Sequence, residues 1–121
     1  MCDVLILGAR SWIGFRLAEA FEAAFPKWQI IGTSTSLSTD SYSRNSISPS
    51  LVKAENSNDF LKLVNNLNPR IIINLLRGED GHGMKIHASV SKICMEKGIR
   101  YVYASSALAL NGYLNHVALT E

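Results

Sequence analysis

The first residues of the chain that could bind a ligand form a glycine-rich turn close to the N-terminus. The turn reads Gly8, Ala9, Arg10, Ser11, Trp12, Ile13 and Gly14. It lies between an apolar run and a helical pattern, where glycine spacing of this kind is typical of phosphate binding. Gly8 permits the tight turn, and Gly14 lets the helix pack closely on the strand. Because backbone amides at a helix N-terminus attract anions, we predict that this turn binds a pyrophosphate.

The turn resembles that of the extended short-chain dehydrogenase/reductase superfamily, which reads Gly-x-x-Gly-x-x-Gly. Ser11 stands here in the place of the middle glycine. A side chain at this position lies where backbone normally approaches the pyrophosphate, so we expect weaker binding or an adjusted geometry. The resemblance implies a dinucleotide cofactor. The alternative is a structural remnant of the fold that binds none.

The residues that would contact the adenosine ribose favour one dinucleotide over the other. Thr33, Ser34 and Thr35 follow the second expected strand, where an acidic residue would bond the ribose hydroxyls. No carboxylate is present there to repel a 2′-phosphate. Arg10 precedes the middle-glycine position, as in many NADP-dependent members of the superfamily, although it could equally be a solvated charge. The resemblance therefore implies NADP as the favoured cofactor and NAD as the alternative.

Two later strand ends match further cofactor contacts of the same superfamily. Glu55 matches the acidic residue after the third strand that faces the adenine. The segment Asn74, Leu75 and Leu76 matches a strand-end Asn-x-Ala that lies under the cofactor, with Asn74 and Leu75 as the expected contacts. Glu55 as a solvated charge, and Asn74 as a polar group satisfied by backbone, are the open alternatives.

A last segment, Tyr103 to Gly112, resembles a stretch of dTDP-4-dehydrorhamnose reductases and sugar-nucleotide epimerases. Ser106 aligns with their catalytic Ser or Thr, and Ser105 with its backbone support. A hydroxyl there would hydrogen-bond the substrate carbonyl beside the nicotinamide. These enzymes also use a Tyr-x-x-x-Lys pair for proton donation. The sequence contains none, since Tyr113 is followed four positions later by Val117.

Strands and helices alternate along the chain and would position these residues. Apolar or β-branched runs predict five strands, at residues 4–7, 29–32, 51–54, 71–76 and 99–104. Apolar residues at helical spacing predict helices from Ile13 to Phe25, from Ser57 to Leu67, and between Gly83 and Gly98. Pro26 and Pro69 end the first two helices, Ser57 is the expected N-cap of the second, and Gly98 the C-terminal cap of the third.

This alternation predicts an α/β fold, a Rossmann-type doubly wound parallel sheet with strand order 3-2-1-4-5. The run at 71–76 is the strongest strand signal and should lie in the middle of the sheet. Residues 33–50 are rich in Ser and Thr and predict a surface loop, and residues 78–83 a glycine-rich connection. We expect one NAD(P)-binding domain over residues 1–121, incomplete before the last strands and the substrate lobe.

Composition excludes several other classes of protein. The net charge is +2 with no dense Lys/Arg run, which gives no reason to expect nucleic acid or a charged membrane as partner. No apolar run approaches the length of about 20 residues that a membrane helix needs, and no signal peptide is evident, so a cytoplasmic location is expected. Cys2 and Cys94 predict reduced thiols. His82 and His87 predict solvent-facing side chains and no metal site.

The function expected from the resemblance is the NAD(P)-binding part of a sugar-nucleotide reductase or epimerase. The whole protein would use a nucleotide-sugar substrate, whereas this chain should not turn over because the Tyr and Lys are absent. A non-catalytic Rossmann-fold regulatory or partner-binding module is the alternative. An exposed edge of the last strand also predicts self-association.

Overall fold

The chain folds as a parallel sheet with helices on both faces. The computed structural model describes residues 2–9, 11–35, 50–76 and 81–104. The elements in chain order are β1 (Val4–Leu7), α1 (Trp12–Ala24), β2 (Ile30–Ser34), β3 (Ser50–Lys53), α2 (Ser57–Leu67), β4 (Ile71–Asn74), α3 (Gly81–Lys97) and β5 (Arg100–Tyr103). The five strands are ordered β3-β2-β1-β4-β5, and every pairing is parallel. The predicted α/β fold and strand order are therefore confirmed.

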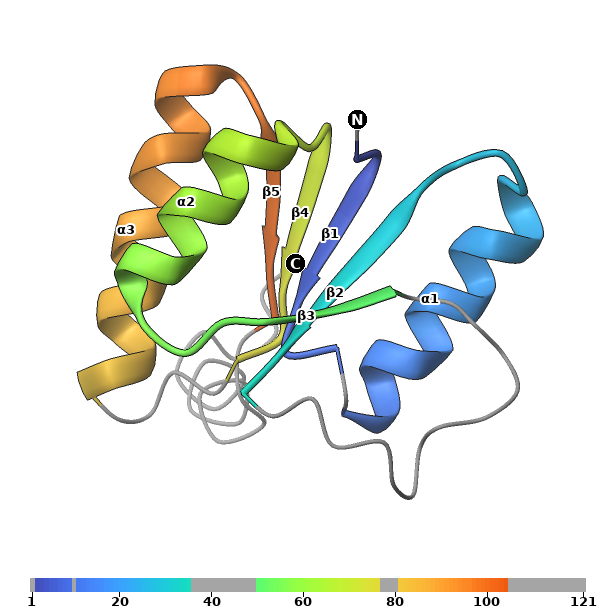
Figure 1. Ribbon diagram of the computed structural model, residues 1–121, viewed down its shortest axis with the longest axis horizontal. Helices are drawn as coiled ribbons and strands as arrows, with labels where there is room; N and C mark the ends of the chain where they lie inside the picture. The colour runs from blue at the N-terminus through green and yellow to red at the C-terminus, as the bar shows by residue number, and fades with distance from the viewer. Residues whose placement is uncertain (1, 10, 36–49, 77–80, 105–121) are drawn as a thin grey trace, which may run out of the picture.

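Strand β1 is the middle strand of this sheet and sets its register. Val4 pairs with Ile30 of β2 on one side and with Ile71 of β4 on the other. All four residues of β1 are buried, because α1 covers one face of the sheet and α2 and α3 cover the other (Figure 1). A strand covered on both faces needs a continuous apolar run, which is what the sequence Val-Leu-Ile-Leu provides.

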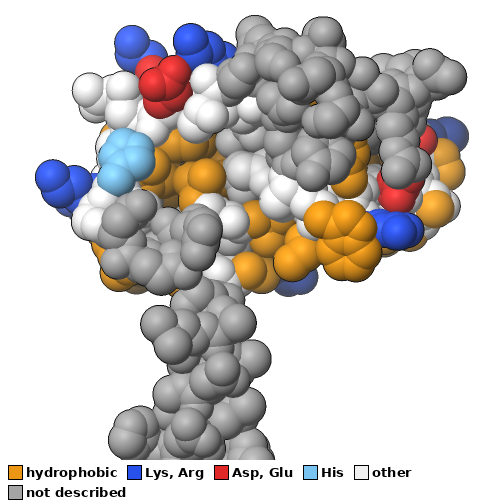
Figure 2. Space-filling view, turned by 90° about the horizontal axis from the view of Figure 1, so that it is seen from below, with side chains coloured by type: hydrophobic (Ala, Val, Ile, Leu, Met, Phe, Trp, Pro, Cys, Tyr) orange, Lys and Arg blue, Asp and Glu red, His pale blue; other side chains and the backbone are white. Residues whose placement is uncertain are grey.

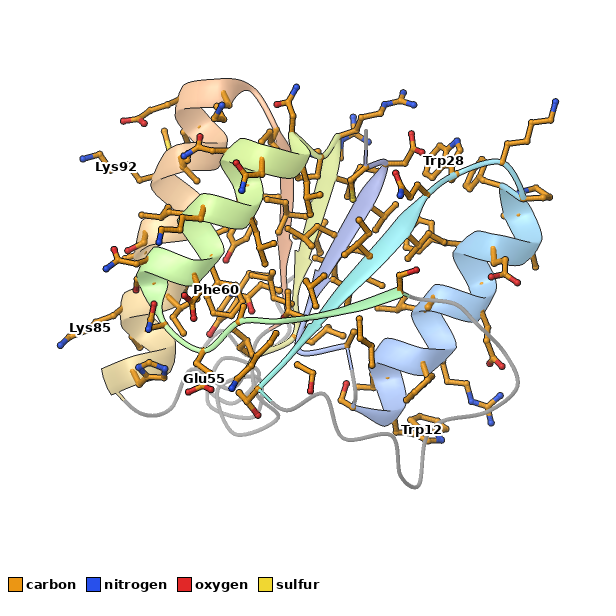
Figure 3. The ribbon with its side chains drawn as sticks, viewed as in Figure 1. Trp12, Trp28, Glu55, Phe60, Lys85 and Lys92 are labelled. Atoms are coloured by element: carbon orange, nitrogen blue, oxygen red, sulfur yellow. The ribbon has the colours of Figure 1, made fainter. Side chains whose placement is uncertain are left out.

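The two faces of the sheet carry two separate apolar cores. On the α2 and α3 face, Leu5 and Leu7 meet Phe60 and Val64 of α2 and Val90 of α3. Phe60 points from α2 toward the sheet (Figure 3) and is almost fully buried. Burying a side chain of this size stabilises the fold by about 1.5–3 kcal/mol. The smaller core on the α1 face is formed by Val4, Ile6, Ala9, Ala18, Ile30 and Ile73.

Helix α2 begins at a different cap from the one the sequence predicts. Asn56, not Ser57, is the N-cap, and its side chain accepts from the Asp59 backbone amide over 3.0 Å. The Asp59 carboxylate in turn accepts from the backbone amide of Asn56, so both parts of a capping box are present. The helix ends at Asn68, which adopts the left-handed conformation with φ 46° before Pro69. The reciprocal bonds explain why the cap moves one residue toward the N-terminus.

Other element limits differ from the expectations by a few residues. Strand β2 runs on to Ser34, so Thr33 and Ser34 belong to the sheet rather than to the loop expected over residues 33–50; residues 36–49 of that loop lie outside the described part. Helix α3 already begins at Gly81, inside the connection expected at 78–83. Gly98, with φ +73°, follows the helix as predicted.

The apolar pattern of α1 is only partly buried. Leu17 and Phe21 pack against the core of the α1 face, whereas Ile13 and Phe25 are largely exposed. Phe25 stacks instead on Trp28, with ring centroids 4.0 Å apart. In the described part of the chain, no helix has the length and apolar character to cross a membrane.

Candidate cofactor-binding site

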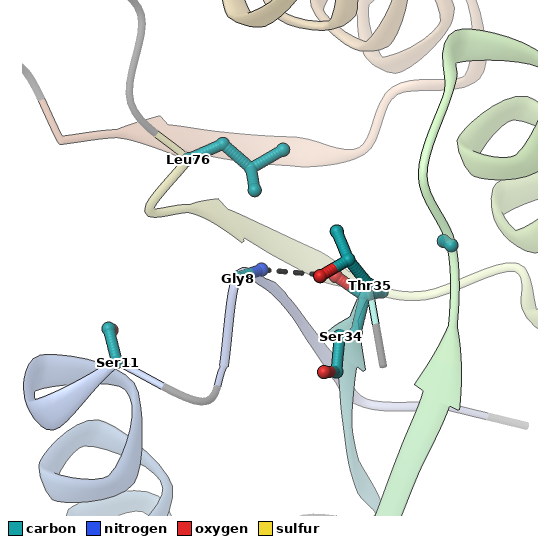
Figure 4. Close-up of a pocket in the computed structure, with 7 residues that line it drawn as sticks. Gly8, Ser11, Ser34, Thr35 and Leu76 are labelled. Carbon is teal, nitrogen blue, oxygen red and sulfur yellow. Dashed lines mark hydrogen bonds between the residues drawn. The ribbon is translucent and has the colours of Figure 1, made fainter. Parts of the chain in front are cut away.

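A pocket opens at the edge of the sheet where the parallel strands end (Figure 4). Its volume is about 230 Å³, and its lining residues come from the ends of β1, β2, β3 and β4 and from the start of α1: Gly8, Ser11, Thr33, Ser34, Thr35, Ala54 and Leu76. In open α/β sheets, the crevice outside the carboxyl ends of the strands is where ligands bind. Charged side chains lie mainly at the rim of this edge, with apolar and uncharged surface between them (Figure 2).

Gly8 forms the turn at the end of β1 and needs to be glycine for two reasons. Its φ of +77° lies in the left-handed region that other residues rarely adopt. A Cβ there would also lie 3.2 Å from Cδ2 of Leu76. The backbone amide of Gly8 donates to the Thr33 hydroxyl over 3.0 Å, and the Ala9 amide donates to the Thr33 carbonyl over 3.0 Å. The turn is thereby fixed to the end of β2.

Gly14 allows α1 to approach the turn closely, as the motif predicts. A Cβ on Gly14 would lie 2.4 Å from the carbonyl oxygen of Ala9, closer than real Cβ atoms come. Ala9 is itself fully buried, so it has no room to withdraw. The N-terminus of α1 is therefore held against the strand that carries the turn.

Ser11 is the N-cap of α1, which gives its side chain a role that glycine could not fill. Its hydroxyl accepts from the Gly14 backbone amide over 3.0 Å. Its backbone, at φ −70° and ψ 162°, is extended and suits any residue. The serine at the middle-glycine position therefore causes no backbone strain, and its oxygen satisfies an amide at the start of the helix.

Trp12 and Ile13 begin α1, and both side chains are exposed. The Trp12 side chain is 66% exposed, and the Arg16 guanidinium lies over its ring, 5.2 Å from the centroid. The amides of Trp12 and Ile13 belong to the first turn of a helix, so they have no acceptor within that helix. Arg10, the charged residue of this turn, lies outside the described residues.

The end of β2 provides hydroxyl groups and no carboxylate to the pocket. Thr33 is 1% exposed and Ser34 is also buried, whereas Thr35 is exposed. Glu55 follows β3 and does not line the pocket; its carboxylate forms an ion pair with Lys53 at 3.5 Å. Of the residues expected near the adenosine, Thr33, Ser34 and Thr35 therefore line the pocket, and Glu55 lies beside it.

Asn74 and Leu75 support the pocket from behind rather than lining it. The Asn74 side chain is fully buried, donating from Nδ2 to the Tyr101 hydroxyl over 2.9 Å and accepting at Oδ1 from the Leu76 amide over 2.9 Å. The Leu75 amide donates to the Leu7 carbonyl over 2.9 Å. The residue from this strand end that lines the pocket is Leu76, the third position of the matched segment, which was not among the expected cofactor contacts.

Ala54 is a second lining residue that the sequence reading missed. It is buried at the end of β3, and its amide donates to the Ser34 carbonyl over 3.0 Å. The sequence could have indicated this residue, because Ala54 stands immediately before Glu55 at the end of a predicted strand, and strand ends converge on the same edge of a parallel sheet.

The two histidines differ from each other, and only His82 is solvent-facing as expected. His82 is exposed, and its Nε2 lies 2.8 Å from the Glu55 carbonyl oxygen. His87 is half-buried, with Nδ1 2.7 Å from the Tyr101 hydroxyl and its ring stacked on Tyr103 at 3.9 Å. The expectation was therefore wrong for His87. Within the described ranges, no group of three or more potential ligands is placed to hold a metal ion.

Both cysteines are free and buried, as the sequence predicts for reduced thiols. Burial raises the pKa of the Cys2 thiol, and likewise that of the Cys94 thiol, to about 11. The expected catalytic Ser106 and its neighbour Ser105 lie outside the described residues.

Comparison with protein-family models and with curated proteins finds no match to this sequence. Solved structures do match. An L-threonine dehydrogenase from Clostridium difficile covers 88% of the chain with a TM-score of 0.71 at 18% identity. An ADP-L-glycero-D-manno-heptose-6-epimerase from Helicobacter pylori covers 88% with a TM-score of 0.72 at 20% identity.

A dTDP-glucose 4,6-dehydratase from Bacillus anthracis, solved in complex with NAD, covers 85% of the chain with a TM-score of 0.63 at 14% identity. The chain spans only 37 to 39% of the length of these three proteins. These similarities, together with the strand order, establish that the chain has the Rossmann-type α/β fold that is also found in a dehydrogenase, an epimerase and a dehydratase.

Proposed function

We propose that this chain is the NAD(P)-binding part of an oxidoreductase or epimerase of the extended short-chain dehydrogenase/reductase type. The observation that carries the proposal is the pocket at the carboxyl edge of the sheet, where Gly8 and Ser11 face the end of β2. The pyrophosphate would bind at the N-terminus of α1, where first-turn amides and the helix dipole favour an anion. The adenosine ribose would lie against Ser34 and Thr35.

NADP is the proposed cofactor, with NAD as the alternative. Two observations support this preference. None of the residues that line the pocket carries a carboxylate, and the acidic residue nearest to it in sequence, Glu55, is paired with Lys53. A 2′-phosphate in the pocket would therefore meet hydroxyl groups rather than a negative charge. Arg10 is the cation that we assign to this phosphate.

The reaction of the whole protein would be hydride transfer to or from a nucleotide-linked sugar. The resemblance of residues 103–112 to sugar-nucleotide reductases and epimerases supports this substrate class, as do the epimerase and dehydratase among the similar structures. Ser106 would hydrogen-bond the reacting oxygen, with Ser105 as its support. We propose that the chain by itself binds the cofactor without turning over a substrate. The assignment of residues 1–121 to one cofactor-binding domain and the cytoplasmic location stay predictions.

Calorimetric titration of NADPH and NADH into the purified chain tests the cofactor, with Arg10→Ala run in parallel. We expect NADPH to bind more tightly than NADH, and Arg10→Ala to remove the difference. Tighter binding of NADH would reverse the cofactor assignment. Binding of neither would refute the proposal and favour the alternative, a non-catalytic Rossmann module.

Self-association through the edge of the sheet is a further part of the proposal. In the described sheet, β5 is an edge strand, and Val102 on it is 48% exposed. An unpaired strand edge with an apolar side chain is a surface on which a second copy can pair. Sedimentation velocity should therefore show dimers or larger species that Val102→Lys reduces. A wild-type chain that stays monomeric over the full concentration range would exclude this contact.

A further inference from the structure

A chain of partly buried hydrogen bonds connects helix α3 to the wall of the pocket. His87 of α3 contacts the Tyr101 hydroxyl of β5 through Nδ1, over 2.7 Å. The Tyr101 hydroxyl also contacts Nδ2 of Asn74, at 2.9 Å, and Oδ1 of Asn74 contacts the backbone amide of Leu76, at 2.9 Å. The side chain of Leu76 lines the pocket beside Gly8.

The chemistry of these groups fixes the direction of donation at the Leu76 end of the chain. The Leu76 amide can only donate, so the Asn74 oxygen must face it and the Asn74 nitrogen must face Tyr101. The Tyr101 oxygen therefore accepts from Asn74, and its own proton remains for donation. Nδ1 of His87 lies 2.7 Å away and accepts this proton in the tautomer that carries its hydrogen on Nε2. Burial raises the pKa of Tyr101, which keeps the hydroxyl in the protonated form that can donate.

The end point of the chain matters because Leu76 contacts the glycine turn directly. A Cβ built on Gly8 would lie 3.2 Å from Cδ2 of Leu76 and 3.5 Å from the Leu76 amide nitrogen. Displacement of the Leu76 backbone would therefore change the space above the turn. The bond from Leu76 to Asn74 is the contact that fixes this backbone to the buried network.

We infer that Tyr101 and His87 are positioning residues for the pocket: they orient the Asn74 amide, which holds the Leu76 backbone and thereby the wall that faces Gly8. The ligand that this wall would serve, a dinucleotide, rests on the proposed function. The position of the wall itself does not depend on that function, and the two are tested by separate measurements.

Amide hydrogen exchange of the full chain tests the inference, with Tyr101→Phe as the main variant and Tyr103→Phe as its matched control. Both substitutions remove one hydroxyl from β5, and only Tyr101 has a hydrogen bond to Asn74. Exchange at Leu76 is compared with exchange at Ala54, whose amide bonds to Ser34 outside the network. We expect Tyr101→Phe to accelerate amide exchange at Leu76, relative to exchange at Ala54, by about tenfold, which is the factor typical of losing one buried hydrogen bond. Tyr103→Phe should leave the exchange rates of both amides unchanged.

A second pair of variants distinguishes the effect of the hydrogen-bond acceptor on His87 from the effect of its ring stacking. His87→Phe keeps a ring to stack on Tyr103 and removes the acceptor, whereas His87→Gln offers an oxygen to the Tyr101 hydroxyl. We expect Leu76 to exchange faster in His87→Phe and at nearly the wild-type rate in His87→Gln. Equal acceleration of Leu76 and Ala54, or no change at Leu76 in Tyr101→Phe, would overturn the inference.

Titration of NADPH into the same variants provides the link to the ligand. We expect Tyr101→Phe and His87→Phe to weaken NADPH binding by about tenfold, with Tyr103→Phe and His87→Gln close to wild type. If the wild-type chain binds neither NADPH nor NADH while Leu76 exchange responds as expected, the proposed function fails and the positioning role stands. Unchanged NADPH affinity in Tyr101→Phe would show that the network has no role in NADPH binding.

Discussion

The backbone amide of Gly8 donates a hydrogen bond to the hydroxyl of Thr33 over 3.0 Å, which joins the turn after β1 to the end of β2. The Ala9 amide strengthens the connection by donating to the carbonyl of the same threonine. Thr33 is 1% exposed, so its side of both bonds is shielded from bulk water. The oxygen of Thr33 therefore serves the shape of the turn, and the more exposed Thr35 is the hydroxyl better placed to meet a ligand.

Replacing Thr33 by valine should destabilise the fold. The substitution keeps the side-chain shape but leaves the Gly8 amide without its acceptor, which costs about 1–3 kcal/mol for a buried group. Thr35→Val, at the exposed neighbour, is the control and should change the unfolding free energy by less than about 0.5 kcal/mol. Urea denaturation measures both variants. Equal midpoints for Thr33→Val and wild type would show that the bond contributes nothing to stability.

Replacing Gly14 by alanine should abolish dinucleotide binding. The new Cβ would lie 2.4 Å from the Ala9 carbonyl oxygen, so α1 must move away from the turn. Gly81→Ala is the matched control, because Gly81 begins α3 and a Cβ there meets nothing within 4 Å. NADPH titration should show a loss of at least about tenfold in Gly14→Ala and wild-type affinity in Gly81→Ala. If Gly14→Ala retains its NADPH affinity, the close approach of α1 to the turn is not required for binding.

Substitutions at Ser11 should separate its role as a cap from its effect on the cofactor. Ser11→Ala removes the acceptor for the Gly14 amide and should cost about 1 kcal/mol of unfolding free energy, whereas Ser11→Gly should cost only a few tenths. Ser11→Gly also restores the spacing of the superfamily motif, so we expect it to bind NADPH at least as tightly as wild type. Thermal unfolding and calorimetry measure the two effects. Weaker NADPH binding in Ser11→Gly would indicate that the serine hydroxyl contacts the ligand.

A carboxylate placed at Thr35 should change the choice of cofactor. Thr35 lines the pocket at the end of β2, where a negative charge would repel a 2′-phosphate and could bond ribose hydroxyls. Thr35→Asp should weaken NADPH binding by about tenfold, as expected for like charges near a protein surface, and leave NADH binding unchanged or tighter. Thr35→Asn, of the same size without the charge, is the control. Equal losses for both cofactors in Thr35→Asp would place the 2′-phosphate elsewhere.

The two buried thiols predict a loss of stability in alkaline solution. Burial raises the pKa of Cys2 and of Cys94 from 9.0 to about 11 in the folded protein. Between these pH values the folded state keeps protons that the unfolded state has lost, so the stabilisation is complete below pH 9.0 and declines toward pH 11. The upper bound is about 3 kcal/mol for each thiol.

The contribution of one thiol can be isolated in a Cys94→Ala variant. Removing the group removes its share of the pH dependence, so the unfolding free energy of Cys94→Ala should fall less steeply than that of wild type between pH 9.0 and 11. The variant is less stable at neutral pH because of the cavity, and the slope is therefore the quantity compared. Identical slopes would mean that the Cys94 thiol titrates alike in the folded and unfolded chains.

The sheet order and the position of the glycine turn could be predicted from the sequence because each depends on local pattern. The apolar run of β1 and the β-branched run of β4 are typical of interior strands, and right-handed crossovers restrict their order. The N-cap of α2 was missed by one residue, although Asp59 three residues after Asn56 is the signature of a capping box.

The network behind the pocket could not be predicted in the same way. Asn74, His87 and Tyr101 come from three separate elements, and no spacing in the sequence connects them. Their contacts follow from the pairing of β4 with β5 and the docking of α3 against β5, which are properties of the folded chain. Asn74 was expected to lie under the cofactor, whereas its side-chain amide forms hydrogen bonds with the Tyr101 hydroxyl and the Leu76 backbone.

The place of β1 in the middle of the sheet also affects how the chain is assembled during synthesis. Val4 is synthesised well before one of its partners, Ile71, which belongs to a strand much further along the chain. Chains dominated by such distant pairings fold slowly, and translation at about 5–20 residues per second adds a delay of several seconds. Strand β1 therefore has both of its edges covered only after β4 has been made, and until then its apolar run is a segment of the nascent chain that is exposed to aggregation.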